Sequence, residues 1–224
     1  MHLSYLALIV ISLALGLGTQ WYIRHTFKRW SQVPIDSHET GAQVARRFLN
    51  SEGLSNVPIR PNGGDDLSDY YDPRSDALYL SNSSENGDSV ASVAVACHEA
   101  GHAVQHDRNY MPARIRMAIV PVVNIGSELW MLVLLAGIFM NLTGLINLGI
   151  LLFAFVVVFQ LVTLPVEFNA SARAMNFISN DVRISPEQAR GARQMLTAAA
   201  LTYVAAALSS ILQLLYLLQQ RQDD

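Results

Sequence analysis

The sequence predicts a mainly α membrane protein with about four transmembrane helices and a small α+β polar domain. The first observation is composition: 51% of the 224 residues are hydrophobic, and the mean hydropathy is +0.26. The second is pattern, because several apolar runs are long enough to cross a bilayer, and one polar region separates the first run from the others. These observations favour a membrane protein with one modest polar domain over an ordinary soluble domain.

The first apolar run extends from about Leu3 to Ile23 and has the roughly 20 residues that a helix needs to cross a bilayer. A cleaved signal peptide is the alternative interpretation. No Lys or Arg precedes the run, however, and no small-residue cleavage site closes it. We therefore expect a transmembrane helix.

The remaining spans lie in the second half of the chain. Residues Met117 to Pro165 stay apolar for about twice the length of one span, and Asn141 and Gly144 near the middle favour a turn. This pattern predicts a helical hairpin. A final run, from about Met195 to Leu218, is rich in Ala and Leu and predicts the fourth span.

The basic residues near the span ends predict the orientation. They fall into three groups, which a four-span arrangement places on one side of the membrane: Arg24, Lys28 and Arg29; Arg114 and Arg116; Arg173, Arg183, Arg190 and Arg193. Because Lys and Arg concentrate on the cytoplasmic side of membrane proteins, that side is expected to be cytoplasmic.

The polar region is expected to form the main soluble domain. Its predicted elements are a helix capped by Asp36 or Ser37 and running through about Asn50, a loop from Pro58 to Asp69, a short strand from Ala77 to Leu80, a loop from Asn82 to Asp88 and a helix from about Ser89 to Asp107. The predicted organisation of the whole chain is 1–30 (first span and basic flank), 31–112 (polar domain), 113–166 (hairpin), 167–194 (a helical segment) and 195–224 (last span and tail).

The charge of the chain argues against nucleic acid binding, and its cysteine content excludes an intramolecular disulfide. The net charge is −3 and the pI about 6.0, and no cluster of Lys and Arg is interleaved with aromatic residues, so no nucleic acid partner is expected. The single cysteine, Cys97, excludes an intramolecular disulfide. The expected partners are instead the lipid bilayer and a substrate.

The motif His98-Glu99-Ala-Gly-His102 lies within the last predicted helix of the polar domain. Four residues of helix return a side chain to the same face, so both histidines can direct an imidazole nitrogen at one Zn²⁺ ion. Glu99 would lie beside the ion without binding it, where its carboxylate can accept a proton from zinc-bound water. The alternative is two ordinary histidines on a polar helix face.

The third ligand is open to three interpretations. The class with a third histidine six residues after the second requires a glycine at position 105 and a histidine at position 108, whereas the chain has Gln105 and Arg108. His106 continues the same helix face but lies about 12 Å along the axis from His98, too far for one ion. Glu167 follows the third span on the side of the motif and would complete a two-His, one-Glu set. Its alternative role is a charge that marks the end of the span.

Four stretches of the chain resemble the YugP-like family of bacterial membrane zinc metallopeptidases: Tyr71-Asp72-Pro73-Arg74, Val93 to His106, Leu164 to Ser171 and Ala198 to Ala207. The resemblance covers nearly the whole chain. It implies zinc dependence, a zincin-like catalytic helix, the ligands His98, His102 and Glu167, and Glu99 as the base. Because the family is one of bacterial membrane proteins, we expect an integral protein of the bacterial inner (plasma) membrane, and the basic residues place its active site on the cytoplasmic side.

The motif that contains Glu167 is also similar to that of HtpX-type and prenyl-protein endopeptidases, in which an Asp four residues later supports a zinc-bound His. Ser171 occupies that position here, and Asn169 stands where an Asp is expected in many YugP-like sequences. Because carboxylates that are hydrogen-bonded to ligating histidines orient them, these departures would lower zinc affinity or activity.

The expected function is hydrolysis of peptide or protein substrates, membrane proteins among them, by a gluzincin-like zinc metallopeptidase. If Ala77 to Leu80 is an edge strand, an extended substrate could pair with it. The alternative, motivated by Asn169 and Ser171, is a zinc-binding membrane scaffold or chaperone-like subunit without proteolytic turnover. A zinc transporter is less favoured, because the proposed ligands lie outside the spans.

Overall fold

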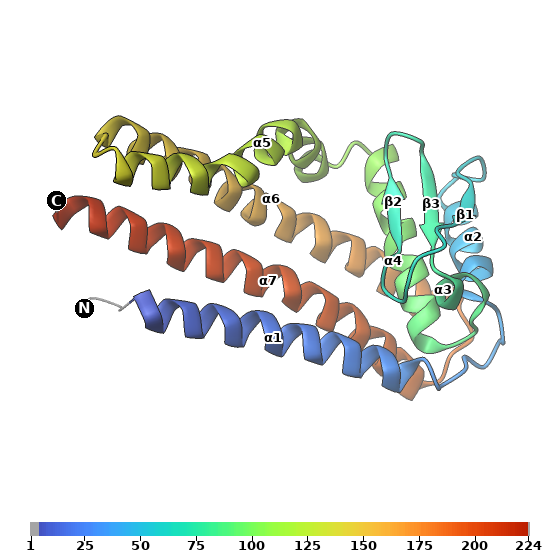
Figure 1. The fold of residues 1–224 in the computed structure, drawn as a ribbon. Helices are drawn as coiled ribbons and strands as arrows, with labels where there is room; N and C mark the ends of the chain where they lie inside the picture. The colour runs from blue at the N-terminus through green and yellow to red at the C-terminus, as the bar shows by residue number, and fades with distance from the viewer. Residues whose placement is uncertain (1–4, 224) are drawn as a thin grey trace. The chain divides into compact units, whose positions relative to one another are not determined.

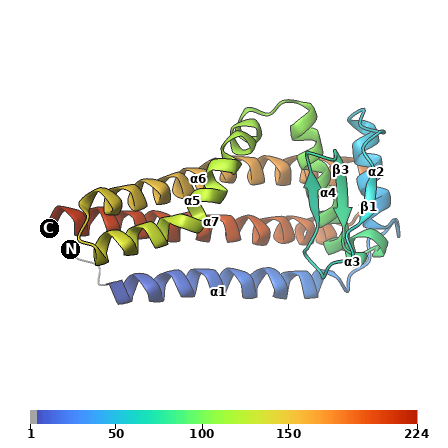
Figure 2. The same cartoon turned by 45° about the horizontal axis from the view of Figure 1, so that its top comes forward.

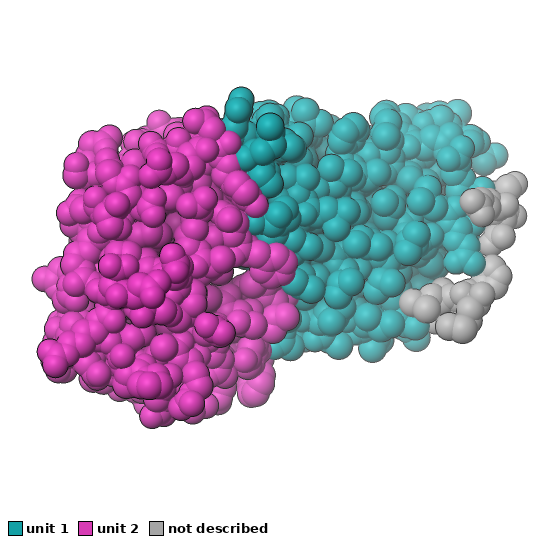
Figure 3. Space-filling view, turned by 180° about the vertical axis from the view of Figure 1, so that it is seen from behind, with its two compact units in different colours: residues 1–19, 111–165, 202–224 teal, residues 20–110, 166–201 magenta. Residues whose placement is uncertain are grey.

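The computed structural model describes residues 5–223, so the first two residues of the predicted initial span, 3 and 4, lie outside them. The elements in chain order are α1 (Tyr5–Trp30), α2 (Gly41–Ser51), β1 (Ile59–Pro61), β2 (Tyr70–Asp72), β3 (Ala77–Leu80), α3 (Asn82–Asn86), α4 (Val90–Asp107), α5 (Met111–Phe139), α6 (Thr143–Asp181) and α7 (Pro186–Asp223) (Figure 1). They form two compact units, one of residues 1–19, 111–165 and 202–224 and the other of residues 20–110 and 166–201 (Figure 3).

Four helices of the described chain, α1, α5, α6 and α7, are long and apolar enough to cross a membrane. Only 6% of the most apolar window of α1 is buried within the protein, and the largest such share, in α7, is 33%. An apolar surface of this extent would be unfavourable in water and is the surface that a lipid environment covers. The predicted membrane protein with four spans and a small sheet region is confirmed.

Within the first unit, α5 and α6 form the predicted hairpin. A Cβ atom at Gly149 would lie 2.9 Å from Leu134 Cα, and one at Gly137 would lie 2.6 Å from Ile146 N. These glycines therefore allow the two helix backbones to approach each other closely. Asn141 lies in the turn and adopts a left-handed φ of 53°, a conformation that Asn tolerates better than most residues.

The second unit has its core around α4, most of which is buried. Helix α2 packs Val44, Phe48 and Leu49 into this core, and the ring of Phe48 stacks on Phe177 of α6 at a centroid distance of 4.7 Å. The predicted start of α2 at Asp36 or Ser37 is wrong. Thr40 is the N-cap, because its side chain and that of Gln43 form a reciprocal capping box.

Two segments expected to be loops contain regular structure. Residues Asn82–Asn86 form α3, since the Ser81 side chain accepts a hydrogen bond from Ser84 N and caps the helix. Residues Ile59–Pro61 form β1, which pairs with β3. The polar composition of the α3 segment and the Pro-rich and Gly-rich composition around β1 had favoured loops. The cap at Ser81 and the pairing of β1 with β3 override these local preferences.

The three strands form one sheet in the order β1-β3-β2. Strand β3 is parallel to β1 and antiparallel to β2, with Tyr71 opposite Leu78. The strand at Ala77–Leu80 is confirmed, but as the central strand of the sheet, so the expectation that it offers an edge for substrate is wrong. The edge beside α4 belongs to β2 (Figure 2).

Candidate metal centre

Helix α4 carries His98, Glu99 and His102. It begins at the predicted position because the Ser89 side chain accepts a hydrogen bond from Ser92 N and so satisfies one of the free N–H groups of the first turn. The two imidazole rings meet edge-on, with centroids 4.8 Å apart. One turn of helix thus places both histidines on a single face, as the motif spacing requires.

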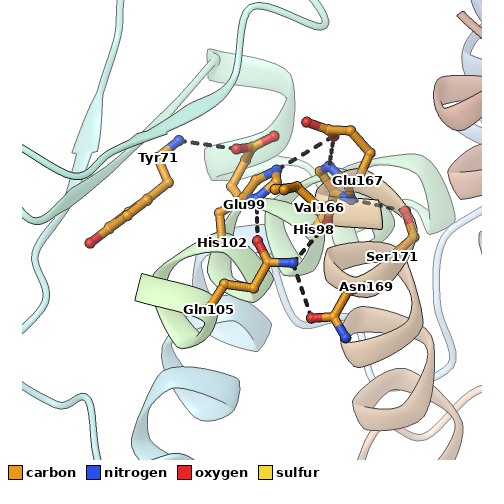
Figure 4. A network of polar contacts seen from close by, with 9 residues as sticks. All are labelled: Tyr71, His98, Glu99, His102, Gln105, Val166, Glu167, Asn169 and Ser171. Carbon is orange, nitrogen blue, oxygen red and sulfur yellow. Dashed lines mark hydrogen bonds and ion pairs between the residues drawn. The ribbon is translucent and has the colours of Figure 1, made fainter. Parts of the chain in front are cut away.

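Glu167 of α6 lies against this histidine pair (Figure 4). Its Oε2 atom is 3.2 Å from His98 Nε2 and 3.6 Å from His102 Nε2. The Glu167 side chain is only 2% exposed, whereas those of His98 and His102 are 12% and 15% exposed. A carboxylate this deeply buried requires a charged or hydrogen-bonding partner, which the two imidazoles or a shared cation would supply.

A glycine in the motif allows the two helices to come together at this point. A Cβ atom at Gly101 would lie 2.7 Å from the Ala170 carbonyl oxygen and 3.2 Å from its Cα atom. Any larger residue would therefore push α6 away from α4. Gly101 thus controls the distance at which the carboxylate of Glu167 meets the two imidazoles.

Each histidine has a neutral partner at its other ring nitrogen. The Ser171 hydroxyl lies 3.1 Å from His98 Nδ1, and the Gln105 side-chain carbonyl oxygen lies 3.0 Å from His102 Nδ1. Because an amide oxygen only accepts, the proton of neutral His102 lies on Nδ1, and the Nε2 lone pair faces Glu167. Ser171 stands four residues after Glu167, where related endopeptidases have an Asp that supports a zinc-bound His, and here it contacts His98.

Gln105 is a candidate positioning residue that the sequence did not indicate, because there it served only to exclude the class with a third histidine. Its side chain is buried and donates to the Val166 carbonyl oxygen over 2.7 Å and to Asn169 Oδ1 over 3.0 Å. Arg173 Nε also donates to Asn169 Oδ1, over 2.8 Å. The available signal was its spacing, because a residue three positions after His102 lies beside it on a helix.

Glu99 lies next to the three-residue group but is not part of it. Its Oε2 atom accepts a hydrogen bond of 3.0 Å from the main-chain N–H of Tyr71 in β2. Burial raises the pKa of Glu99 above the ordinary carboxyl value, and the nearby charges of His98 and His102 oppose this effect. The carboxylate is therefore close to the site, oriented by the sheet and more basic than a solvated one.

His102 shows the opposite balance. Burial by itself lowers the pKa of its imidazole, but the hydrogen bond to Glu167 and the charges of Glu99 and Glu167 outweigh burial, so the pKa is raised. The raised pKa means that protons compete more strongly for the His102 imidazole than for a solvated one. A metal ion bound to His102 would have to displace any proton from the nitrogen that it uses.

His106 lies apart from the three-residue group, although it is on the same helix. Its Nδ1 atom is 2.8 Å from the Tyr71 hydroxyl oxygen, and the single proton of that hydroxyl is donated to Asp76 over 2.6 Å. Tyr71 thus connects β2 to α4 at two points, through its N–H to Glu99 and through its hydroxyl to His106. His106 holds the end of this strand.

The donor atoms fit a zinc ion. Among the described residues, His98, His102 and Glu167 offer three ligand atoms that all lie within 4.8 Å of one another. Atoms that share one tetrahedral zinc ion at about 2.1 Å lie about 3.4 Å apart, close to the 3.2 and 3.6 Å that separate Glu167 from the two imidazoles. Two His and one carboxylate with a fourth position left for water is a set that catalytic zinc uses.

The match to a family model agrees with this chemistry. The model of a family described as "Putative neutral zinc metallopeptidase" matches residues 5–222. The chain therefore belongs to this family of neutral zinc metallopeptidases, and family membership implies Zn²⁺ as the cofactor.

A curated protein of Bacillus subtilis (strain 168) is similar to the chain over nearly its full length. It is named "Putative membrane protease YugP" and is 43% identical over 211 residues, which cover 94% of this chain and 93% of that protein. No solved structure matches the chain. The predicted resemblance to the YugP-like family is confirmed.

Proposed function

We propose that the protein is a zinc-dependent membrane endopeptidase in which His98, His102 and Glu167 hold the ion and Glu99 is the general base. The observation that carries this proposal is the approach of the Glu167 carboxylate to both Nε2 atoms, at 3.2 and 3.6 Å, with a second carboxylate alongside that is not part of the ligand group. One carboxylate to bind the ion and one to move protons are the two groups that metal-assisted peptide hydrolysis needs.

Zinc, when bound, supplies a Lewis acid that polarises the scissile carbonyl and brings the pKa of water towards about 7. Glu99 then accepts the proton of the attacking water and delivers it to the leaving amine. Its burial suits the first of these steps, because a carboxyl group with a raised pKa accepts a proton more readily than a solvated one. Gln105 and Ser171 keep the two imidazoles in the orientation that directs Nε2 at the ion.

The substrate is proposed to bind along β2 in an extended conformation. Strand β2 is an edge of the sheet, and the main-chain N–H of Tyr71 points at Glu99 rather than into a strand pair. A peptide added to this edge would pair with main-chain groups other than the Tyr71 N–H, which is donated to Glu99, and its own carbonyl groups would pass the catalytic carboxylate. Main-chain recognition of this kind suits peptide or protein substrates of varied sequence.

The proposed location is the bacterial inner membrane, with the metal centre on the cytoplasmic side. The support is the distribution of basic residues in the sequence, which places all three basic groups on one side. Membrane proteins are among the proposed substrates, because the protein is itself anchored in the bilayer.

The test is a peptide-cleavage assay on the purified full-length protein, with zinc content measured on the same samples. Glu99→Gln should retain one zinc per chain and lose cleavage, because the amide has the shape of the carboxylate but cannot accept the proton. The control variant is Glu187→Gln, an exposed carboxylate in the first turn of α7. Zinc-dependent cleavage that survives Glu99→Gln would overturn the mechanism. Loaded wild-type protein that cleaves no peptide would favour the scaffold function.

A further inference from the structure

The second unit contains a polar cavity that is separate from the metal centre. It has a volume of about 850 Å³ and lies between the end of α1, the loop that joins β1 to β2, and the start of α3. This size is within the range of about 300–1,000 Å³ that small-molecule sites occupy. None of its lining residues belongs to the metal-binding group or to its hydrogen-bonding partners.

Charges of both signs line this cavity. Arg24 and Lys28 are one helical turn apart on α1 and form one wall, and Asp65 and Asp66 in the β1–β2 loop contribute to another. All four residues are exposed. None of their side chains makes a hydrogen bond or an ion pair to another residue that the structure describes. The cavity therefore presents two cations and two anions that are not used within the fold.

This arrangement is complementary to a zwitterion that carries a phosphate and a primary ammonium group. Arg and Lys side chains bind phosphate oxygens through charge-assisted hydrogen bonds. A carboxylate pair accepts hydrogen bonds from an ammonium group, whose N–H bonds a quaternary ammonium lacks. A purely anionic ligand would satisfy Arg24 and Lys28 but would be repelled by Asp65 and Asp66.

The position of the two cations indicates a lipid as the source. Helix α1 is one of the four candidate membrane spans, and its basic residues lie in its last two turns. Basic residues at the end of a span lie at the depth of the lipid headgroups. From this position and the charges that line the cavity, we infer that the cavity binds the headgroup of a phosphatidylethanolamine molecule, with its phosphate on Arg24 and Lys28 and its amine on Asp65 and Asp66.

The test measures lipid retention by native mass spectrometry on delipidated full-length protein in detergent. Equal amounts of dioleoyl phosphatidylethanolamine, phosphatidylcholine and phosphatidylglycerol are offered together. The wild type should retain phosphatidylethanolamine about tenfold over the other two, because charged hydrogen bonds to the amine are available to this lipid alone. Asp65→Asn combined with Asp66→Asn should reduce retention of phosphatidylethanolamine to the level of phosphatidylcholine.

The second part of the lipid-retention test removes the positive charges of Arg24 and Lys28. Arg24→Gln combined with Lys28→Gln should reduce retention of phosphatidylethanolamine about tenfold or more. The matched control is Arg29→Gln, because Arg29 is an exposed cation at the same helix end that does not line the cavity. Zinc stoichiometry should stay at one in every variant and serves as the folding check. If a double variant does not fold, the single substitutions carry the same comparison.

Three results would overturn the inference. Equal retention of phosphatidylethanolamine and phosphatidylcholine by the wild type would show that the carboxylates do not select an amine. A loss in Arg29→Gln as large as in the Arg24 and Lys28 double variant would indicate a general basic surface. Displacement of the lipid by an equal concentration of water-soluble glycerophosphoethanolamine would assign the cavity to a soluble ligand. The proposed protease function would be unaffected by any of them.

Discussion

The Gln105 side-chain amide donates a 2.7 Å hydrogen bond to the main-chain carbonyl of Val166, the residue immediately before Glu167. The same side chain accepts from His102 Nδ1 at 3.0 Å. One buried residue on α4 therefore orients one proposed ligand and holds the backbone of α6 beside another. The proposed metal centre is therefore expected to depend on this connection as well as on the three proposed ligands.

Gln105→Ala should weaken zinc binding by about 10–100-fold, because it leaves His102 Nδ1 without an acceptor and releases the Val166 carbonyl. Gln105→Glu should have a smaller effect, since the carboxylate still accepts from His102 but cannot donate to Val166. Zinc affinity is measured by competition with a chelator. Asp107→Asn, a change at an exposed position of the same helix, is the control. Equal affinities in wild type and Gln105→Ala would contradict the supporting role.

Gly101→Ala should destabilise the protein by about 1–3 kcal/mol, as overpacking usually does. The added methyl group would meet the Ala170 carbonyl oxygen at 2.7 Å and force α4 and α6 apart. Zinc affinity should fall in the same variant, because Glu167 would move away from the histidines. Thermal unfolding and chelator competition provide the two measurements.

A second Gly→Ala change distinguishes overpacking at Gly101 from the effect of replacing any helical glycine. A Cβ atom added at Gly16 in α1 would have no neighbouring side chain or other contact within 4 Å. Gly16→Ala should therefore leave stability and zinc affinity at the wild-type level or slightly increase stability, since Ala has the higher helix propensity. A loss of zinc affinity in Gly16→Ala as large as in Gly101→Ala would contradict the packing argument.

The stabilisation that zinc provides should decrease on acidification, starting above pH 6.5. In the metal-free fold the pKa of His102 is raised, whereas in the unfolded chain it is about 6.5. The extra proton therefore stabilises the metal-free fold below about pH 6.5, and this contribution is lost as the pH rises through the raised pKa. Zinc must displace that proton, so its own contribution shows the opposite trend.

The measurement is the difference in Tm between zinc-loaded and metal-free protein between pH 5.5 and 8.5, a range of about one unit below to two units above the usual histidine pKa. The difference should be largest at the alkaline end and should begin to fall while the pH is still above 6.5. A zinc-induced gain in Tm that grows as the pH falls would show that no protonated histidine competes with the metal.

Much of the metal centre could be predicted from the sequence because its main determinants are local. His98 and His102 are one helical turn apart, and Ser89 is a strong N-cap followed by an apolar helix, so periodicity alone defines this part. The approach of Glu167 required a further step, namely the four-span topology that returns the third span to the side of the motif. That step used only hydropathy and the basic residues, and the structure brings Glu167 to the histidine pair.

The remaining features depend on contacts that local pattern does not determine. The strand at Ala77–Leu80 was recognisable, but its central place in the sheet follows from pairing with β1 and β2, which are only three residues each. The hydrogen bond from Tyr71 N–H to Glu99 depends on the same pairing. The partners of Gln105 on α6 lie 61 and 64 positions away in sequence, so its role appears only when the two helices are packed together.

The zinc content of Glu167→Ala in the full-length protein tests most directly whether α6 supplies a zinc ligand. Because the proposed site takes ligands from both α4 and α6, this variant should lose tight binding of one zinc per chain, as should His98→Ala and His102→Ala. Glu187→Ala, which removes an exposed carboxylate, should keep it. Metal analysis after dialysis against a weak chelator gives the stoichiometry. Tight one-to-one zinc in Glu167→Ala would contradict the proposed site.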